Sequence, residues 1–271
     1  MSTILTKVRA ELSAQRAIIK KNIANEAALR ASFLLQVVGM MINNTSLLAV
    51  WVFFFQATGE VNRWSVKETI ALQGLIALVY GIGFSFFHGV RTLPQAVHLG
   101  SFDSFLLTPR NLYLRIFTAK IKTSAFGDMI YGVILLGLYF VMAHLSLLQT
   151  ILLLALVVPT TLIFVNVAFC VSLLAFLIPD AGQIADEAFE IFFSPSLYPA
   201  SLYSGFLRFI FLFGIPSLAI GGLPVEIVRD MKFSWFFVVW AIAIFWTMLA
   251  NVLLARAVKR YEGGNLISSR I

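Results

Sequence analysis

Six long apolar runs constrain this chain more than any other feature. Each holds about 20 residues or more, the length that an α-helix needs to cross the roughly 30 Å hydrocarbon core of a bilayer. The chain is 60% hydrophobic and 12% charged, a balance that excludes a soluble globular domain. We therefore predict an all-α integral membrane protein that forms a single domain, residues 1–271. The predicted spans are 31–57, 68–90, 123–142, 150–178, 205–223 and 233–255.

Basic residues between the apolar runs predict the orientation. The polar stretch 91–122 carries five of them: Arg91, Arg110, Arg115, Lys120 and Lys122. The N-terminal arm and the tail 256–271 are also basic. Lys and Arg concentrate on the cytoplasmic side of membrane proteins, so we expect these stretches and both termini in the cytoplasm of a multi-pass protein of the cell (inner) membrane. A polar stretch as long as 91–122 between two spans usually has a function of its own.

The N-terminal arm, residues 1–30, has helical periodicity. Its apolar residues fall on one helical stripe and its basic residues lie mostly away from it. This pattern predicts an amphipathic helix in the membrane interface, and packing of the helix on the cytoplasmic ends of the protein is the alternative. The stripe consists of Leu5, Val8, Leu12, Ile19 and Ile23.

Polar side chains occur inside several predicted spans. Asn43 and Asn44 lie in the first span and Asn166 lies in the fourth. An amide that faces lipid is costly, so each is expected either to hydrogen-bond a neighbouring helix or to line a substrate path. Asp128, near the start of the third span, is expected to pair with Lys120 or Lys122; an ion-coupling carboxylate is the alternative.

Two segments in the second half of the chain depart from the simple pattern. Residues 180–204 are acidic and are expected as a second internal segment of unassigned function, a short amphipathic helix followed by a turn broken at Pro195 and Pro199. Pro216 and the pair Gly221-Gly222 interrupt the apolar residues that follow. Apolar segments rich in helix breakers enter a membrane only where protein covers them. We therefore expect this external segment to dip into the membrane only under protein cover.

The chain lacks the motifs of a motor or a catalyst. It contains no Gly-x-x-x-x-Gly-Lys-Ser/Thr phosphate loop, no His-Glu-x-x-His and no Cys-x-x-Cys. We predict no catalytic residue, metal site or cofactor of its own. The net charge of +7 is explained by membrane topology and does not indicate nucleic-acid binding. Glu187 and Glu190 form the only paired carboxylates of interest, and a solvated helix face explains them.

Several short motifs resemble those of type-2 ABC exporter permeases, specifically the small six-span bacterial group that lacks its own ATPase domain. The likeness covers nearly the whole chain, and the order and spacing of the motifs carry it. The motifs are Trp64-x-x-x-Glu68, Gly100-x-Phe102-Asp103-x-x-Leu106-Leu107-x-Pro109, Tyr198-Pro199-x-x-x-Tyr203, Ile215-Pro216 and Tyr261-Glu262-x-Gly264.

The resemblance implies a permease that works with separate ABC ATPase subunits, which bind the ATP, and with a second permease, identical or homologous. It implies that 91–122 contains a cytoplasmic coupling helix that fits a groove of the ATPase, with Asp103 and Arg110 as exposed polar contacts. It also implies that the N-terminal helix is an interfacial connecting helix and that the apolar segment between the last two spans forms short re-entrant external helices. The residues implied in coupling are Gly100, Phe102, Asp103, Leu106, Leu107, Pro109 and Arg110. An amphipathic or hydrophobic substrate would be exported through a cleft lined by Phe and Leu side chains together with Asn43, Asn44 and Asn166.

Two other functions remain open from the residues alone. A stand-alone secondary transporter or channel would need a titratable residue in the membrane, and Asp128 is the candidate. A lipid-modifying membrane enzyme would need convergent acidic or histidine side chains, and the Glu187 region is the candidate.

Overall fold

Helices account for all the regular structure in the described part of the chain. The computed structural model describes residues 2–28, 30–107, 110–178 and 181–261, and over these residues it contains no strand apart from one isolated bridge between Val61 and Trp64. Five helices are long and apolar enough to cross a membrane, and each overlaps one of the predicted runs. They are α2 (Arg30–Thr58), α3 (Val66–Phe87), α7 (Ala125–Met142), α8 (Leu147–Ser172, continued by η1, Leu173–Phe176) and α12 (Phe233–Arg260).

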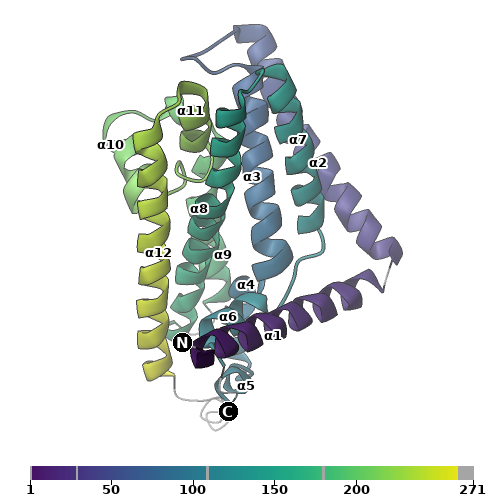
Figure 1. Ribbon diagram of the computed structural model, residues 1–271, viewed down its shortest axis with the longest axis vertical. Coiled ribbons are helices and arrows are strands. Elements are labelled where there is room, and N and C mark those ends of the chain that lie inside the picture. Colours follow the sequence, from purple (N-terminus) through teal and green to yellow (C-terminus); the bar gives the residue numbers. More distant parts are fainter. Residues whose placement is uncertain (1, 29, 108–109, 179–180, 262–271) are drawn as a thin grey trace.

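These five helices stand side by side with α3, α7 and α8 at the centre (Figure 1). Small residues allow α3 and α7 to approach closely: a Cβ on Gly81 would lie 2.3 Å from the backbone nitrogen of Met129, and one on Gly132 would lie 2.4 Å from that of Leu78. In contrast, α2 leans away from the bundle and packs mainly on α7, so most of its surface is exposed.

Capping boxes fix where two of the long helices begin. The Ser65 hydroxyl accepts a hydrogen bond from the backbone N–H of Lys67, while the Glu68 carboxylate accepts one from the N–H of Ser65 at 2.9 Å. Ser146 and Gln149 make the same reciprocal arrangement at the start of α8. Each box satisfies backbone donors that a helix start leaves open. The Trp64-x-x-x-Glu68 motif thus includes a helix-start signal.

One predicted span is not a single helix. Within 205–223, α10 (Gly205–Phe209) is continued by a π-helical turn, η4 (Ile210–Gly214), and residues 215–221 are irregular before α11 (Gly222–Asp230) begins. Ten helical residues extend only about 15 Å, half of the hydrocarbon core. The break follows from Pro216, which lacks an N–H and forces Ile215 out of helical geometry. No single continuous helix covers this range, and the interruption falls at Pro216 as predicted.

The acidic segment does not form a separate internal loop. It folds as α9 (Gly182–Phe193), η2 (Ser194–Leu197) and η3 (Ala200–Leu202). It contacts α4 through the pair Arg91–Asp186 and α3 through the pairs Tyr80–Phe193 and Gln73–Leu197. Its aromatic face is buried, whereas its carboxylates are exposed on the opposite face. The segment therefore runs alongside the central helices for much of their length.

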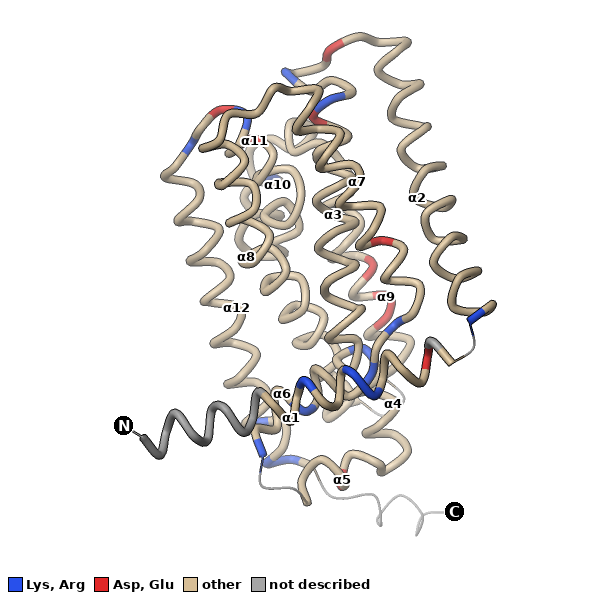
Figure 2. Tube along the Cα trace, turned by 45° about the vertical axis from the view of Figure 1, so that its right-hand side comes forward, with Lys and Arg blue, Asp and Glu red and all other residues tan. Residues whose placement is uncertain are grey.

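The N-terminal helix α1 (Ser2–Ala27) lies across one end of the bundle (Figures 1 and 2). The Thr118 hydroxyl donates a hydrogen bond to the Gln15 side chain at 2.5 Å, and the Asn22 amide donates one to the backbone oxygen of Thr118 at 3.1 Å. These contacts favour packing on the protein itself. Of the apolar stripe, Ile19 and Ile23 are partly buried, and the side chains of Leu5, Val8 and Leu12 lie outside the described part.

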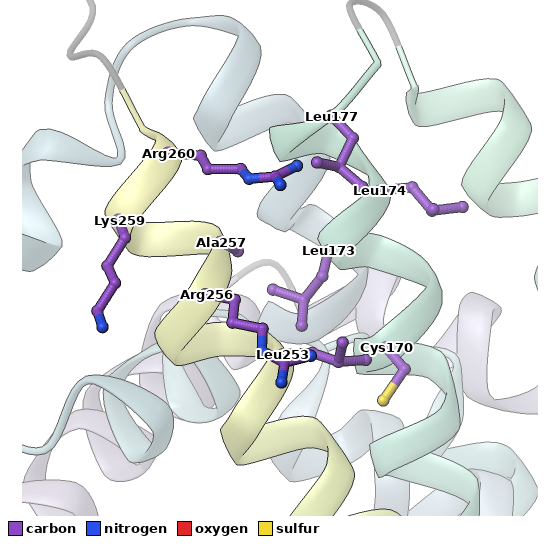
Figure 3. A pocket seen from close by; sticks show the side chains of 9 residues that line it. All are labelled: Cys170, Leu173, Leu174, Leu177, Leu253, Arg256, Ala257, Lys259 and Arg260. Carbon is purple, nitrogen blue, oxygen red and sulfur yellow. The ribbon is translucent and has the colours of Figure 1, made fainter.

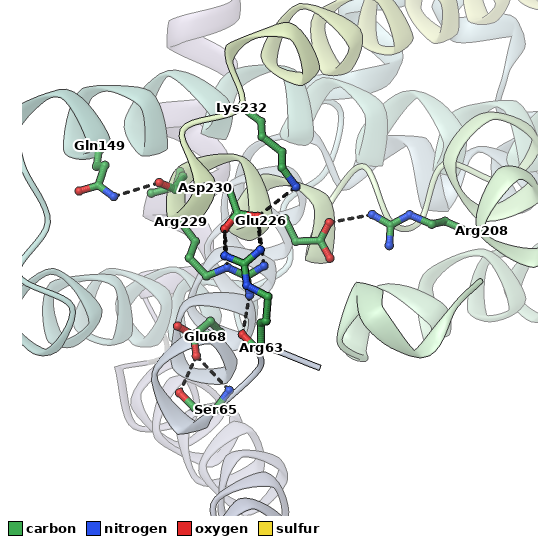
Figure 4. Close-up of polar contacts among 10 residues, drawn as sticks. Arg63, Ser65, Glu68, Gln149, Arg208, Glu226, Arg229, Asp230 and Lys232 are labelled. Carbon is green, nitrogen blue, oxygen red and sulfur yellow. Dashed lines mark hydrogen bonds and ion pairs between the residues drawn. The ribbon is translucent and has the colours of Figure 1, made fainter. Parts of the chain in front are cut away.

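Lys and Arg gather at the end of the bundle where α1, the segment between α3 and α7, and the last turns of α12 meet; we call it the basic end (Figure 2). At the opposite end, the Asp230 carboxylate lies within 3.0 Å of Arg63, Arg229 and Lys232 (Figure 4). Hydrogen bonds from Arg229 first, and then from Lys232, lower the pKa of Asp230 to about 2. This cluster fastens the α2–α3 loop to α11.

Candidate functional site

The polar segment between α3 and α7 forms three short helices at the basic end: α4 (Gly89–His98), α5 (Asp103–Leu106) and α6 (Leu112–Thr118). Gly89 allows α4 to touch α6, since a Cβ there would lie 1.9 Å from the backbone oxygen of Ile116. Gly100, with a φ of 67°, turns the chain from α4 into α5. As a result, α5 projects below the bundle, furthest from α11 among the labelled helices (Figure 1).

Phe102, just before α5, is fully buried, with 0% of its surface exposed. Its ring packs edge-on against the rings of Phe176 and Tyr261, both at 5.0 Å between centroids, and lies 5.8 Å from Phe105. Phe176 ends η1, and Tyr261 follows the last residue of α12. Phe102 therefore anchors the projecting segment to the ends of two long helices and is not itself a surface contact.

Arg115 of α6 holds α5 from the other side. Its guanidinium donates to the backbone oxygen of Phe105 and, at 3.2 Å, to that of Ser104, and it lies 5.4 Å from the centre of the Phe105 ring. Sequence reasoning counted Arg115 only as a basic residue. Its role in holding α5 depends on backbone oxygens ten and eleven residues away, and no local sequence pattern indicates these contacts.

The outer surface of α5 combines apolar and basic groups. Leu107 is 84% exposed and Leu106 is 43% exposed, Arg110 is also exposed, and Asp103 is partly buried. Pro109 lies outside the described residues. Exposed leucines at the tip of a charged projection are typical of a surface that another protein covers. Of the predicted coupling residues, the structure thus places Leu106, Leu107 and Arg110 outward, Phe102 inward and Gly100 at the turn.

Comparison with known proteins agrees with this architecture. A sequence model of the family described as "ABC-2 family transporter protein" matches residues 40–264. The chain belongs to the ABC-2 transporter family. It is accordingly a multi-pass membrane protein of the kind that forms the membrane component of a transporter, and such permeases generally work with ATPase subunits. Searches of curated proteins and of solved structures gave no match.

A second connection links the projecting segment of this ABC-2 permease to its bundle. The Tyr113 hydroxyl of α6 donates to the side-chain oxygen of Asn166 in α8, and the Asn166 amide donates to the Thr247 hydroxyl of α12 at 3.1 Å and to the backbone oxygen of Leu162 at 2.8 Å. Burial raises the pKa of Tyr113 above its ordinary value, so the hydroxyl stays protonated and donates. Asn166 is fully buried, and protein groups bind its polar atoms.

The other predicted amides of the permease lie on α2. The Asn44 amide donates to the Asp128 carboxylate at 2.6 Å, while Asn43 is exposed. Asp128 is 2% exposed, and its second oxygen has no hydrogen-bond partner among the described residues. The expected pair between Asp128 and Lys120 or Lys122 is not formed; Lys122 donates instead to the Tyr80 hydroxyl at 2.8 Å.

An apolar pocket of about 350 Å³ lies between the upper half of α2 and the η2–η3 turns. Its walls include Trp51, Phe54, Phe55, Trp64, Tyr198 and Leu202. Among the described residues, no group of three His, Cys, Asp or Glu side chains could hold a metal ion. The pocket suits an apolar or aromatic group, because it offers large ring surfaces and few polar atoms.

Proposed function

We propose that this ABC-2 protein is the permease subunit of an exporter driven by ATP hydrolysis in separate nucleotide-binding subunits, and that it binds no cofactor of its own. The observation that supports this proposal is the projecting α5 segment. Its exposed leucines and Arg110 form a compact docking surface, and the buried Phe102 ties that surface to η1 and α12.

Two connections would transmit movement from the docked ATPase. The first passes through Phe102 to Phe176 and Tyr261, and the second passes through Tyr113 and Asn166 to Thr247. Both connections reach α12, and on the other side the first reaches η1 and the second reaches α8. A shift of the α5 segment would therefore change the packing between α12 and the helix formed by α8 and η1. ATP binding drives transport only if the docked ATPase contacts the segment differently in the two states of the permease.

The proposed topology has six crossings with the basic end in the cytoplasm. The five long helices make five of them, and the α9–η3 segment, rather than 205–223, makes the sixth. Both termini then lie on the cytoplasmic side of the cell membrane, in accord with the concentration of Lys and Arg there. The short helices α10 and α11 correspond to the external re-entrant pair. Accessibility of single introduced cysteines at Glu60 and Lys120 to an impermeant thiol reagent, in a Cys170→Ser background, tests this orientation.

A second permease, identical or homologous, would cover the exposed faces of α2 and α9. Only Val37 and Phe55 are buried along the 29 residues of α2. The exposed carboxylates of α9 are costly against lipid, so a partner chain or an aqueous cleft should face them. The cleft between two such permeases would present Asn43 and the aromatic pocket to an amphipathic or hydrophobic substrate, and membrane lipids would surround the remaining surface.

Copurification tests the function and the docking site together. A tagged permease expressed with its ATPase should retain that ATPase, and Leu107→Asp should weaken the association by about 2 kcal/mol, roughly 30-fold, as for an apolar interface anchor. Arg110→Ala and Asp103→Ala should weaken it less. Lys67→Ala removes an exposed cation from the opposite end and serves as the matched control. Unchanged association of the Leu107 variant would remove the docking assignment, and a permease that transports without any ATPase would overturn the function.

One observation supports a different function. Asp128 is a buried carboxylate with one unpartnered oxygen inside a long apolar helix, an arrangement found at ion-coupling sites. A secondary transporter would lose ion-driven flux in an Asp128→Asn variant. The ABC-2 function predicts instead that this variant retains ATP-dependent transport.

A further inference from the structure

A cavity of about 410 Å³ lies at the basic end, between the ends of α8 and α12 (Figure 3). One side is apolar: Leu173 and Leu174 come from η1, Leu177 directly follows η1, and Leu253 comes from α12. Cys170, the only cysteine of the chain, lies on α8 at the end of this wall away from Leu177. The cavity is distinct from the α5 docking surface and from the aromatic pocket on α2.

Basic side chains from α12 cover the rim of this cavity. Arg256 and Arg260 are one helical turn apart, and Figure 3 shows both side chains on the side of α12 that faces the leucines of η1. Lys259 also lines the cavity but points away from α8. The three side chains are exposed, and none makes an ion pair with a carboxylate of the described residues.

We propose that this cavity binds an anionic phospholipid from the leaflet at the basic end. The headgroup phosphate would lie between Arg256 and Arg260, since each guanidinium can donate two parallel hydrogen bonds to phosphate oxygens. One acyl chain would cover the leucine wall down toward Cys170. Basic clefts between membrane helices are suited to anionic headgroups. A free phosphate ion would satisfy the arginines but would leave the leucines uncovered, so the geometry favours a lipid.

A lipid bound here would contact the same two elements that hold the α5 anchor. Leu173 and Leu174 belong to η1, which ends at Phe176, and Arg260 is the residue before Tyr261. Phe176 and Tyr261 are the rings that enclose Phe102. The lipid would therefore stabilise the packing between η1 and α12 from the outside. This effect follows from the contacts of the cavity and does not depend on the identity of the transported substrate.

Native mass spectrometry of the full-length protein in detergent tests the site. After delipidation, the protein is titrated with phosphatidylglycerol and with phosphatidylcholine of the same acyl chains. At about 1 kcal/mol for each basic residue, two arginines give phosphatidylglycerol an advantage of about 30-fold for the first bound lipid. Arg256→Gln/Arg260→Gln should remove this advantage, whereas Lys20→Gln/Lys21→Gln, which removes two exposed cations from α1, should keep it. Equal affinity for the two lipids, or an equal loss in both variants, would overturn the proposal.

The location of the lipid is tested with Cys170 as the only thiol. Modification by N-ethylmaleimide should slow about tenfold when phosphatidylglycerol is present at ten times its dissociation constant, because only the empty cavity reacts. The double arginine variant should show no slowing at this lipid concentration. Equal protection by inorganic phosphate would overturn the lipid assignment. If the Cys170 thiol proves unreactive without lipid, the Leu253→Cys/Cys170→Ser variant places the only thiol on α12. The same protection from N-ethylmaleimide is then measured from the opposite wall.

Discussion

Replacing Phe102 by alanine should release α5 from the bundle without unfolding it. The Phe102 ring is fully buried against Phe176 and Tyr261, and both contacts lie at the periphery of the fold. We therefore expect the Phe102→Ala protein to insert and to retain its helical content, while residues 99–107 open far more often.

The size of the effect follows from the burial. Truncation of a fully buried phenylalanine costs about 3–5 kcal/mol, and the edge-on contacts with two rings place this site within that range. If local opening carries the whole cost, a loss of 3 kcal/mol raises the population of the open segment about 100-fold. Phe102→Leu keeps most of the apolar volume and should cost less than about 1.5 kcal/mol.

Amide hydrogen exchange reads this opening directly. The N–H of Phe105 donates to the backbone oxygen of Phe102 at 2.9 Å, and that of Leu107 donates to the oxygen of Asp103 at 3.3 Å. Both should exchange about 100-fold faster in Phe102→Ala, or reach the unprotected rate. Leu107→Ala, which truncates a side chain that is 84% exposed, should leave the exchange of Phe105 unchanged. A change below about threefold in Phe102→Ala would refute the anchor.

Two further predictions concern packing and pH. Gly89→Ala should lower stability by about 1–3 kcal/mol, because its Cβ would meet the backbone oxygen of Ile116, while Gly137→Ala, with no atom within 4 Å of its Cβ, should be neutral or slightly stabilising in thermal unfolding. The pKa of Asp230 in the folded protein, about 2, lies below its ordinary value of 3.8, so its stabilisation is complete above about pH 4 and is lost as the pH falls toward 2. Asp230→Asn should flatten that part of the thermal stability profile; an unchanged slope between pH 5 and pH 2.5 would show that Arg229 does not hold the carboxylate.

The sequence predicts the long helices well because length and hydropathy are local properties. Each of the five apolar helices overlaps a predicted run, and the starts of α3 and α8 follow from capping residues within four positions. The range 205–223 is not a single helix. There the apolar content is sufficient, but Pro216 and the irregular residues that follow it prevent a continuous helix.

The acidic segment has two unlike faces. Its charges favour an aqueous location, yet the opposite face of α9 carries Phe189, which is 1% exposed and contacts the rings of Phe84 and Phe164. The short amphipathic helix predicted here is present, and Ala185, Phe189 and Phe192 form its buried face. Composition alone does not show that this face packs against the central helices.

The sequence motif does not resolve the faces of the candidate site. The motif around Gly100 and Phe102 falls on the projecting α5 segment, yet it does not say which residues face outward. A helix of four residues is too short for periodicity to separate its faces, so Phe102 and Leu107 look alike in the sequence. Asp128 likewise pairs with Asn44, 84 residues away, and no local pattern indicates a partner at that distance.

Site-specific crosslinking tests the central claim most directly. A photoreactive phenylalanine placed at Leu107, which is 84% exposed at the tip of the α5 segment, should form a crosslink in intact cells to a polypeptide that contains an ATP-binding phosphate loop. The same residue at Glu60, exposed in the α2–α3 loop at the opposite end, should form none to that polypeptide. A crosslink from Glu60 and none from Leu107 would contradict the account, because the ATPase would then meet the permease at the wrong end.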